Sequence, residues 1–444
     1  MTPQLIQDEI EAAHPRQHFF NPNYRIPLLK QVSVNSFWLV LTRLITQAQL
    51  VVFTAVIARR LGEIGFGQYA FITSIVFLGN VVTTFGTDTY IIRELARSED
   101  SKASLLTAAL WIQILFSIAF IAIIIPTVAI YPNKTAQTVL GLQFYSLALI
   151  PLAFYTVYSS VLRAYQRMDL YLGANLVTIL VQTVGAWFVV TGQGSLLRLI
   201  FLLFITQCIS AIFAGILCKW QIPEFHLFLK LPWKSVRTVI KSVWPLALLS
   251  GLGVLYTRLG ILTLSFLSGD AATGLFSASA RVVEALKTVH IAVLGALLPA
   301  LSQLGSLIIP DTESRTNESA ANNLFRHSFF WLLLIAIGIA MAATFMARPI
   351  ISILYGQAYL QGIFFLQILV WLLVPYSINA SVTIRWITRN HEKQVAIVMT
   401  AGLLSALLLN VWLIPLFGLL GACLAALGAE FLQAILFLAW RKPW

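Results

Sequence analysis

The sequence predicts an all-α integral membrane protein, and three observations support that prediction. Of its 444 residues, 59% are hydrophobic and 10% are charged, and the mean hydropathy is +0.85. A soluble domain carries roughly 25% charged residues, so this composition excludes a soluble core. Apolar runs of about 20 residues, long enough to cross a bilayer as helices, recur along nearly the whole chain. Transmembrane barrels show short alternating segments instead, which this sequence lacks.

Twelve membrane spans are expected after a polar start. Residues 1–31 are polar and mixed in charge, which indicates a cytoplasmic tail and not a signal peptide. The 275–308 run exceeds one crossing, so its polar beginning is expected at the interface or along a cavity. The expected spans are 32–58, 68–92, 104–130, 137–162, 170–191, 196–218, 239–267, 275–308, 326–347, 361–384, 394–414 and 417–440.

Lys and Arg residues are unevenly distributed between the two sides of the predicted membrane. With a cytoplasmic N-terminus, 20 of the 29 fall in cytoplasmic segments, seven fall on the opposite side, and two lie within spans. Because cytoplasmic loops are the ones enriched in Lys and Arg, both termini are predicted to be cytoplasmic. The same distribution explains the net charge of +12 without a nucleic-acid partner, since the basic residues are scattered through short loops.

A basic stretch divides the spans into six and six. We expect an N-terminal six-helix bundle at 32–218, a cytoplasmic connector at 219–238 and a C-terminal six-helix bundle at 239–444. Because each half has an even number of spans, a pseudo-two-fold axis along the membrane normal would relate the two halves. The loops after the first and seventh spans share a pattern, in which Gly62, Glu63, Gly67 and Tyr69 match Gly269, Asp270, Gly274 and Phe276.

Two arginines lie at membrane depth, Arg43 and Arg258, each in the first span of one half. A guanidinium keeps its charge there, so it needs a counter-ion, a water-filled cavity or an anionic cargo. The two lie on opposite sides of the midplane, roughly 9 Å apart along the normal. Their registers differ, since Arg43 precedes Gly62 by 19 residues and Arg258 precedes Gly269 by 11. They indicate either a cationic pathway for an anionic headgroup or two structurally satisfied arginines.

The eighth span opens with Arg281, Glu284 and Lys287 at three-residue spacing. Residues three apart are neighbours on a helix, so Glu284 can pair with both cations. This set could line the mouth of a cavity or form plain interfacial ion pairs. The candidate substrate-binding residues are Arg43, Arg258, Arg281 and Lys287.

Asp88 and Glu430 are the acids well inside apolar runs. Because burial favours the protonated form of a carboxyl group, each could couple transport to a proton or another cation. Each could equally be the structural partner of Arg43 or Arg258. With Glu284, they are the candidate coupling residues.

No enzyme, metal centre or cofactor is expected. The loops are too short for a catalytic domain, and they lack a Gly-rich phosphate loop and a His-Glu-x-x-His helix. The cysteines (Cys208, Cys218 and Cys423) show no metal-ligand spacing.

Several segments carry a resemblance to a known family: ARRLGEIGFGQYAFITSI, FGTDTYIIRELAR, the Tyr-x-Arg that ends at Arg258, LLPALSQL and ILYGQAYLQGIFFLQIL. They resemble polysaccharide-lipid flippases of the O-antigen and exopolysaccharide type, in the multidrug/oligosaccharidyl-lipid/polysaccharide exporter superfamily. The resemblance covers residues from about 30 to 440. Arg258 matches the family's span-seven Arg, and Arg43 matches a basic residue often present in span one. Members often show Arg-x-Asp in span seven, whereas Gly260 stands here in place of the acid, so Arg258 is expected to lack a local partner.

The resemblance implies a multi-pass protein of the inner (plasma) membrane with a central cationic cavity. Its cargo would be an undecaprenyl-diphosphate-linked oligosaccharide, moved to the outer leaflet by alternating access for surface polysaccharide biosynthesis. Its partners would be membrane lipids and this cargo, with contacts to other polysaccharide-assembly proteins left open.

Three other functions are weighed against this one. A multidrug or other lipid-linked-substrate antiporter of the same superfamily is the main alternative, although cationic drugs call for a cavity rich in acids. A membrane-embedded polymerase or ligase would need a large outer loop with paired catalytic groups. A major-facilitator carrier would need a Gly- and Arg/Lys-rich loop, which RELARSEDSKAS does not match.

Overall fold

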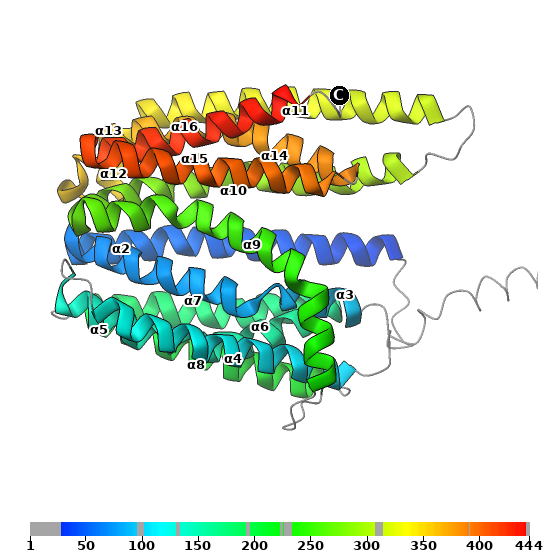
Figure 1. Ribbon diagram of the computed structural model, residues 1–444, viewed down its shortest axis with the longest axis horizontal. Coiled ribbons are helices and arrows are strands. Elements are labelled where there is room, and N and C mark those ends of the chain that lie inside the picture. The colour runs from blue at the N-terminus through cyan, green and yellow to red at the C-terminus, as the bar shows by residue number, and fades with distance from the viewer. Residues whose placement is uncertain are drawn as a thin grey trace, which may run out of the picture.

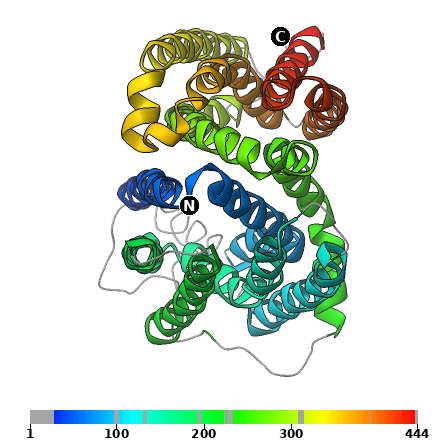
Figure 2. The same cartoon turned by 90° about the vertical axis from the view of Figure 1, so that its left-hand side faces the viewer.

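A computed structural model shows that the chain is helical and built in two halves. It describes residues 28–440 apart from 96–101, 130–133, 192–195, 223–224, 226–232, 307–313 and 390, so most of the predicted tail lies outside the described residues. The long helices run roughly parallel or antiparallel and gather into an N-terminal and a C-terminal group (Figures 1 and 2). Ten helical segments of the described chain are long and apolar enough to cross a membrane. The all-α membrane fold is confirmed, while the twelve spans and the cytoplasmic termini stay predictions.

The N-terminal half begins with a helix that reverses direction. α2 (Leu28–Thr84) has two limbs, 28–61 and 63–84, which run in opposite directions from Gly62 (Figure 1). Gly62 has a φ of 66°, a left-handed conformation that glycine adopts without strain. The predicted spans 32–58 and 68–92 are therefore joined without an irregular loop. The half continues with α3 (Thr87–Leu95), α4 (Lys102–Ala129), α5 (Ala136–Ser146), α6 (Leu149–Ala164), α7 (Met168–Thr191) and α8 (Leu196–Gln221).

The C-terminal half starts with α9 (Trp233–Leu267), whose first residues lie inside the predicted connector. The first turns of α9 run across the direction of the other helices, and the rest bends to run along it (Figure 1). The domain boundaries themselves stay predictions. The remaining elements are α10 (Gly269–Ser306), α11 (Ser314–Phe345), α12 (Ala347–Leu354), a 3-10 turn (Gln357–Tyr359), α13 (Gly362–Leu369), a second 3-10 turn (Val370–Leu372), α14 (Leu373–Thr388), α15 (Glu392–Phe417) and α16 (Leu419–Ala439).

The two halves meet most closely where the second limb of α2 and the helix α10 begin. We name this end of the bundle the glycine end, because it contains Gly62 and Gly269. The largest hydrophobic cluster of the described chain joins the halves there. Its aromatic members include Phe66 of α2, whose ring centroid lies 6.4 Å from that of Tyr355 and 6.3 Å from that of Tyr359. Burial of apolar side chains from both halves in one cluster stabilises their association.

A reciprocal backbone contact forms the centre of the glycine end. A Cβ atom on Gly67 would lie 1.8 Å from the carbonyl oxygen of Asp270, and one on Gly274 would lie 1.9 Å from that of Glu63. The two predicted motifs therefore contact each other, and each places its second glycine against the acid of the other. Because any side chain would overlap a carbonyl group, glycine is required at both positions for this approach.

Polar contacts reinforce the glycine end. Lys134, just before α5, donates hydrogen bonds to the carbonyl oxygen and Oγ of Ser265, at 2.8 and 2.6 Å. Its Nζ also forms a 2.8 Å ion pair with Asp270, and its side chain is 3% exposed. Arg59 Nε donates to the carbonyl oxygen of Leu354 at the C-terminus of α12, at 2.9 Å. Charge-assisted hydrogen bonds of this kind are stronger than neutral ones, and each of these joins one half to the other.

At the opposite end of the bundle, the halves are joined through the first turns of α9. Val236, Val239 and Val243 are buried there in a cluster with residues of α3 and α4. Ser235 Oγ lies 2.8 Å from Ser104 Oγ of α4. Among the described residues, the contacts at this end thus include apolar side chains and a hydroxyl pair.

Candidate functional site

A cluster of ionised side chains lies between α9 and α10. Glu284 accepts a 2.8 Å hydrogen bond from Nη1 of Arg281, and its other carboxylate oxygen lies 3.6 Å from Nη1 of Arg258. The side chains of Arg258 and Arg281 are 13% and 12% exposed, whereas that of Glu284 is 34% exposed. Two largely buried guanidinium groups therefore share one carboxylate that remains accessible.

Two guanidinium nitrogens of Arg258 have hydrogen-bond donors that are unused within the described chain. Its Nε and Nη1 are buried and have no hydrogen-bond acceptor among the described residues. The 3.6 Å contact with Glu284 is an ion pair too long to be a hydrogen bond. The guanidinium also lies over the ring of Phe77, 4.9 Å from its centroid, and so faces the second limb of α2 in the other half. Because buried N–H groups normally find acceptors, these two are suited to an incoming anion.

A second ion pair lies on the same stretch of α10. Lys287 Nζ is 3.9 Å from a carboxylate oxygen of Glu430 on α16, and it lies 4.4 Å from the centroid of the Tyr376 ring on α14. The other carboxylate oxygen of Glu430 accepts a 2.7 Å hydrogen bond from Asn379 Nδ2. Lys287 is therefore held loosely, while Glu430 is fixed by α14.

These contacts differ from pairings that the sequence predicted or left open. Pairing with Arg43 or Arg258 was one alternative for Glu430, but Glu430 pairs with Lys287. Glu284 was expected to pair with Lys287 as well as Arg281; Lys287 pairs instead across to α16. Positions 281 and 287 point about 120° apart on the helix, and Lys287 lies against Glu430 of α16 and the Tyr376 ring of α14. Arg258 was expected to lack a local partner because of Gly260, but Glu284 on the next helix supplies one.

Arg43 is not part of this cluster. Its side chain is exposed on the first limb of α2, and it forms no hydrogen bond or ion pair within the described chain. The difference in register explains the separation, since Arg43 lies eight residues further from its loop glycine than Arg258 does. Eight residues of helix span about 12 Å. The structure therefore brings together Arg258, Arg281 and Lys287 of the four predicted binding residues.

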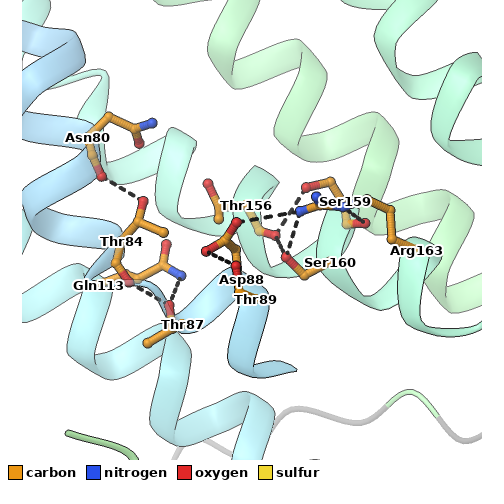
Figure 3. A network of polar contacts seen from close by, with 10 residues as sticks. All are labelled: Asn80, Thr84, Thr87, Asp88, Thr89, Gln113, Thr156, Ser159, Ser160 and Arg163. Carbon is orange, nitrogen blue, oxygen red and sulfur yellow. Dashed lines mark hydrogen bonds and ion pairs between the residues drawn. The ribbon is translucent and has the colours of Figure 1, made fainter. Parts of the chain in front are cut away.

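Asp88 belongs to a separate network inside the N-terminal half (Figure 3). Its carboxylate lies 3.9 Å from Nη2 of Arg163 on α6, whose guanidinium also contacts Ser160 Oγ at 3.3 Å. Pairing with Arg43 or Arg258 was one alternative for Asp88, but the ion-pair partner of Asp88 is Arg163. Arg163 directly follows the predicted span 137–162 and was therefore counted among the loop cations, so its position carried no signal of this contact.

The cluster on α9 and α10 has a net positive charge, because three cations face two carboxylates. The Arg258–Glu284 contact of 3.6 Å and the Lys287–Glu430 contact of 3.9 Å are longer than charge-assisted hydrogen bonds. An anion can therefore replace the carboxylate as the partner of either cation. The described residues contain no group of three or more His, Cys, Asp or Glu side chains that could hold a metal ion. The arrangement is therefore suited to binding a multiply charged anion by direct contact with Arg and Lys.

The fold is similar to those of known membrane transporters. An inward-facing multidrug resistance transporter of the MATE family has a TM-score of 0.71 and 14% identity, with 89% of this chain and 93% of that chain covered. The lipid II flippase MurJ in an inward closed conformation has a TM-score of 0.71 and 15% identity, with 91% and 87% covered. A transporter of the MOP superfamily from Pyrococcus furiosus has a TM-score of 0.65 and 13% identity, with 93% of this chain and 94% of that chain covered.

Sequence comparison identifies the family. No curated protein matches the sequence. A family model described as polysaccharide biosynthesis protein matches residues 32–305, which include the first seven predicted spans, all but the last three residues of the eighth, and most of the ionised cluster. The expected membership in a polysaccharide-export group of transporters is confirmed: the chain belongs to the polysaccharide biosynthesis protein family.

Proposed function

We propose that this protein moves an undecaprenyl-diphosphate-linked oligosaccharide across the cytoplasmic membrane by alternating access, and so serves surface polysaccharide biosynthesis. The observation that carries the proposal is the cluster of Arg258, Arg281 and Lys287 at the junction of the halves, in which Nε and Nη1 of Arg258 are buried and have no hydrogen-bond acceptor among the described residues. The family match and the fold of a lipid II flippase support a lipid-linked cargo.

The diphosphate would bind by replacing carboxylate groups as the ion-pair partners of the cluster's cations. Its oxygens would accept from the free N–H groups of Arg258 and draw Lys287 away from Glu430, at contacts that are already long. A guanidinium suits this task because its fixed fork of donors matches phosphate oxygens. The sugar and lipid parts would contribute little to this step, so the site would recognise the diphosphate common to different oligosaccharide cargoes.

Alternating access is supported by the shape of the molecule. The TM-score against the inward-facing MATE-family transporter is 0.71, and against an outward-facing one it is 0.62. The tight glycine end lies on the side predicted to face away from the cytoplasm. Together these features fit a state whose cargo would enter from the cytoplasmic side.

Ion coupling would use the acids of the same cluster. When an anion draws Lys287 away, Glu430 would lose its nearest cation, and a buried carboxylate without a partner favours uptake of a proton or another cation. Glu284 would respond less to loss of Arg258, because it keeps its 2.8 Å contact with Arg281 and is 34% exposed. Asp88 stays a weaker candidate, because its partner Arg163 is outside the cluster.

The test is to replace Arg258 by Gln. Cells that depend on R258Q should lose surface polysaccharide at least about tenfold, because each charged contact to the diphosphate contributes about 1.5–3 kcal/mol. R348Q, which removes an exposed arginine from α12, is the matched control and should retain wild-type levels. Membrane fractions must contain both variants in equal amounts, and intracellular lipid-linked oligosaccharide should accumulate with R258Q alone.

Normal surface polysaccharide with R258Q would contradict the proposed pathway. The multidrug alternative makes a different forecast: drug resistance, and not surface polysaccharide, would depend on the protein and on Arg258. Drug resistance that depends on this protein and falls with R258Q, at unchanged polysaccharide, would favour the antiporter.

A further inference from the structure

The first turns of α9 carry a stripe of exposed aromatic and basic side chains. Trp233, Arg237, Lys241 and Trp244 follow one another at intervals of four, four and three residues, and all four are exposed. This spacing places them on one face of the helix. The two indoles are 68% and 56% exposed, so neither is used to pack the protein.

The opposite face of the same turns is anchored to the N-terminal half. Val236, Val239 and Val243 are 5%, 2% and 0% exposed and pack in a cluster with residues of α3 and α4. Ser235 adds the hydroxyl contact with Ser104. The stripe is thus held rigidly and is directed away from the protein.

The direction of this segment places the stripe along a membrane surface. The other long helices run along the direction in which a bilayer would be crossed, whereas the first turns of α9 run across it at the end opposite the glycines (Figures 1 and 2). An amphipathic helix in this position lies in the plane of the headgroups. Tryptophan prefers that depth because its ring is apolar and its N–H is polar.

We propose that the stripe of Trp233, Arg237, Lys241 and Trp244 is a binding surface for anionic phospholipid headgroups. Arg237 and Lys241 lie between the two indoles, so one phosphate-bearing headgroup can contact both cations while the rings rest on its glycerol and acyl region. Lys219 and Trp220 at the end of α8 are exposed as well and add to the basic and aromatic character of the connector. This inference does not depend on what the protein transports.

The consequence is an attachment between the connector and the bilayer. The segment that bears the stripe joins the two halves and is packed on the N-terminal one. Bound anionic lipid would therefore hold the N-terminal half at a constant depth while the rest of α9 changes its angle. A neutral bilayer would supply the apolar contact for the indoles but no ionic one.

The test uses the purified full-length protein in neutral detergent, titrated with phosphatidylglycerol or phosphatidylcholine and followed by native mass spectrometry. Each cation near an anionic surface contributes about fivefold to affinity, so R237Q/K241Q should weaken the tightest phosphatidylglycerol binding roughly 10- to 30-fold. R60Q/K393Q removes the same charge from two exposed positions elsewhere and should leave that binding unchanged. Neither pair should alter phosphatidylcholine binding, and inorganic phosphate should not displace the lipid.

Two further measurements keep the proposal open to refutation even if a variant is poorly produced. In the wild-type protein, raising the salt concentration should weaken binding of phosphatidylglycerol and not of phosphatidylcholine, because exposed charges are screened. W233A/W244A should weaken the binding of both lipids. Equal losses in R237Q/K241Q and R60Q/K393Q, or salt-independent phosphatidylglycerol binding, would overturn the assignment.

Discussion

The two ends of the bundle join the same two halves by different means. At the glycine end, backbone meets backbone, with Gly67 against Asp270 and Gly274 against Glu63, and a buried Lys134 adds three polar contacts. At the opposite end, valine side chains of α9 rest on α3 and α4, with one serine pair beside them. The first junction requires glycine and a buried ion pair at fixed positions. The second relies on apolar side-chain packing, which tolerates volume-conserving substitutions better. A transporter of this fold would keep the first closed while the second admits cargo.

The largest expected effect is from a single methyl group at the glycine end. Gly67→Ala would place a Cβ 1.8 Å from a carbonyl oxygen of the other half, so the halves must separate there. The thermal midpoint of the purified protein should fall further than for any other change named below. Gly338→Ala is the matched control, because a Cβ at Gly338 would meet nothing within 4 Å. It should leave the midpoint unchanged or raise it slightly, and equal losses in the two variants would break the comparison.

Lys134→Met should have the next largest effect. It leaves the Asp270 carboxylate, which is 12% exposed, without its cation. Removing one partner of a buried ion pair destabilises a protein by about 3–5 kcal/mol, which thermal or denaturant unfolding would detect. The double variant K134M/D270N should recover part of the loss, because no uncompensated charge remains. A double variant that is no more stable than K134M would show that Lys134 acts through packing instead.

The smallest effect is expected at the opposite end. Ser235→Ala removes one hydroxyl pair and should lower the free energy of unfolding by about 0.5–1 kcal/mol. Ser242→Ala, about two turns further along the same helix, is the control, since its exposed hydroxyl donates to the backbone carbonyl of Thr238 on that helix. If S235A lowered the free energy of unfolding as much as K134M does, the proposed difference between the two ends of the bundle would be contradicted.

The sequence was sufficient for the parts of the fold that depend on periodicity. Long apolar runs predicted the membrane helices, and the shared glycine pattern indicated two related halves. That the two glycine motifs touch each other was not predicted and is seen only in the structure. The pairing of Arg281 with Glu284 also followed from helical spacing, because both lie on one helix.

Partners on different helices could not be obtained in this way. Glu430 meets Lys287, and Glu284 meets Arg258, through the relative rotation of packed helices, which spacing along the chain does not encode. Lys134 was counted as one of several loop cations, yet it is among the most deeply buried charges described. The local sequence around a lysine at a span boundary does not show whether its ammonium group is solvated or donates to the backbone of another helix.

The crossing of the two glycine motifs has the geometry of a homodimer interface within one chain. In a two-fold dimer, residue i of one subunit contacts residue j of the other, and j contacts i in return. Gly67 with Asp270 and Gly274 with Glu63 reproduce that isologous arrangement between halves of different sequence. Such an interface responds to damage as a unit, because once one glycine is filled and the helices separate, the second contact is already lost. G67A and G274A should therefore be strongly non-additive, with the double variant little worse than either single one.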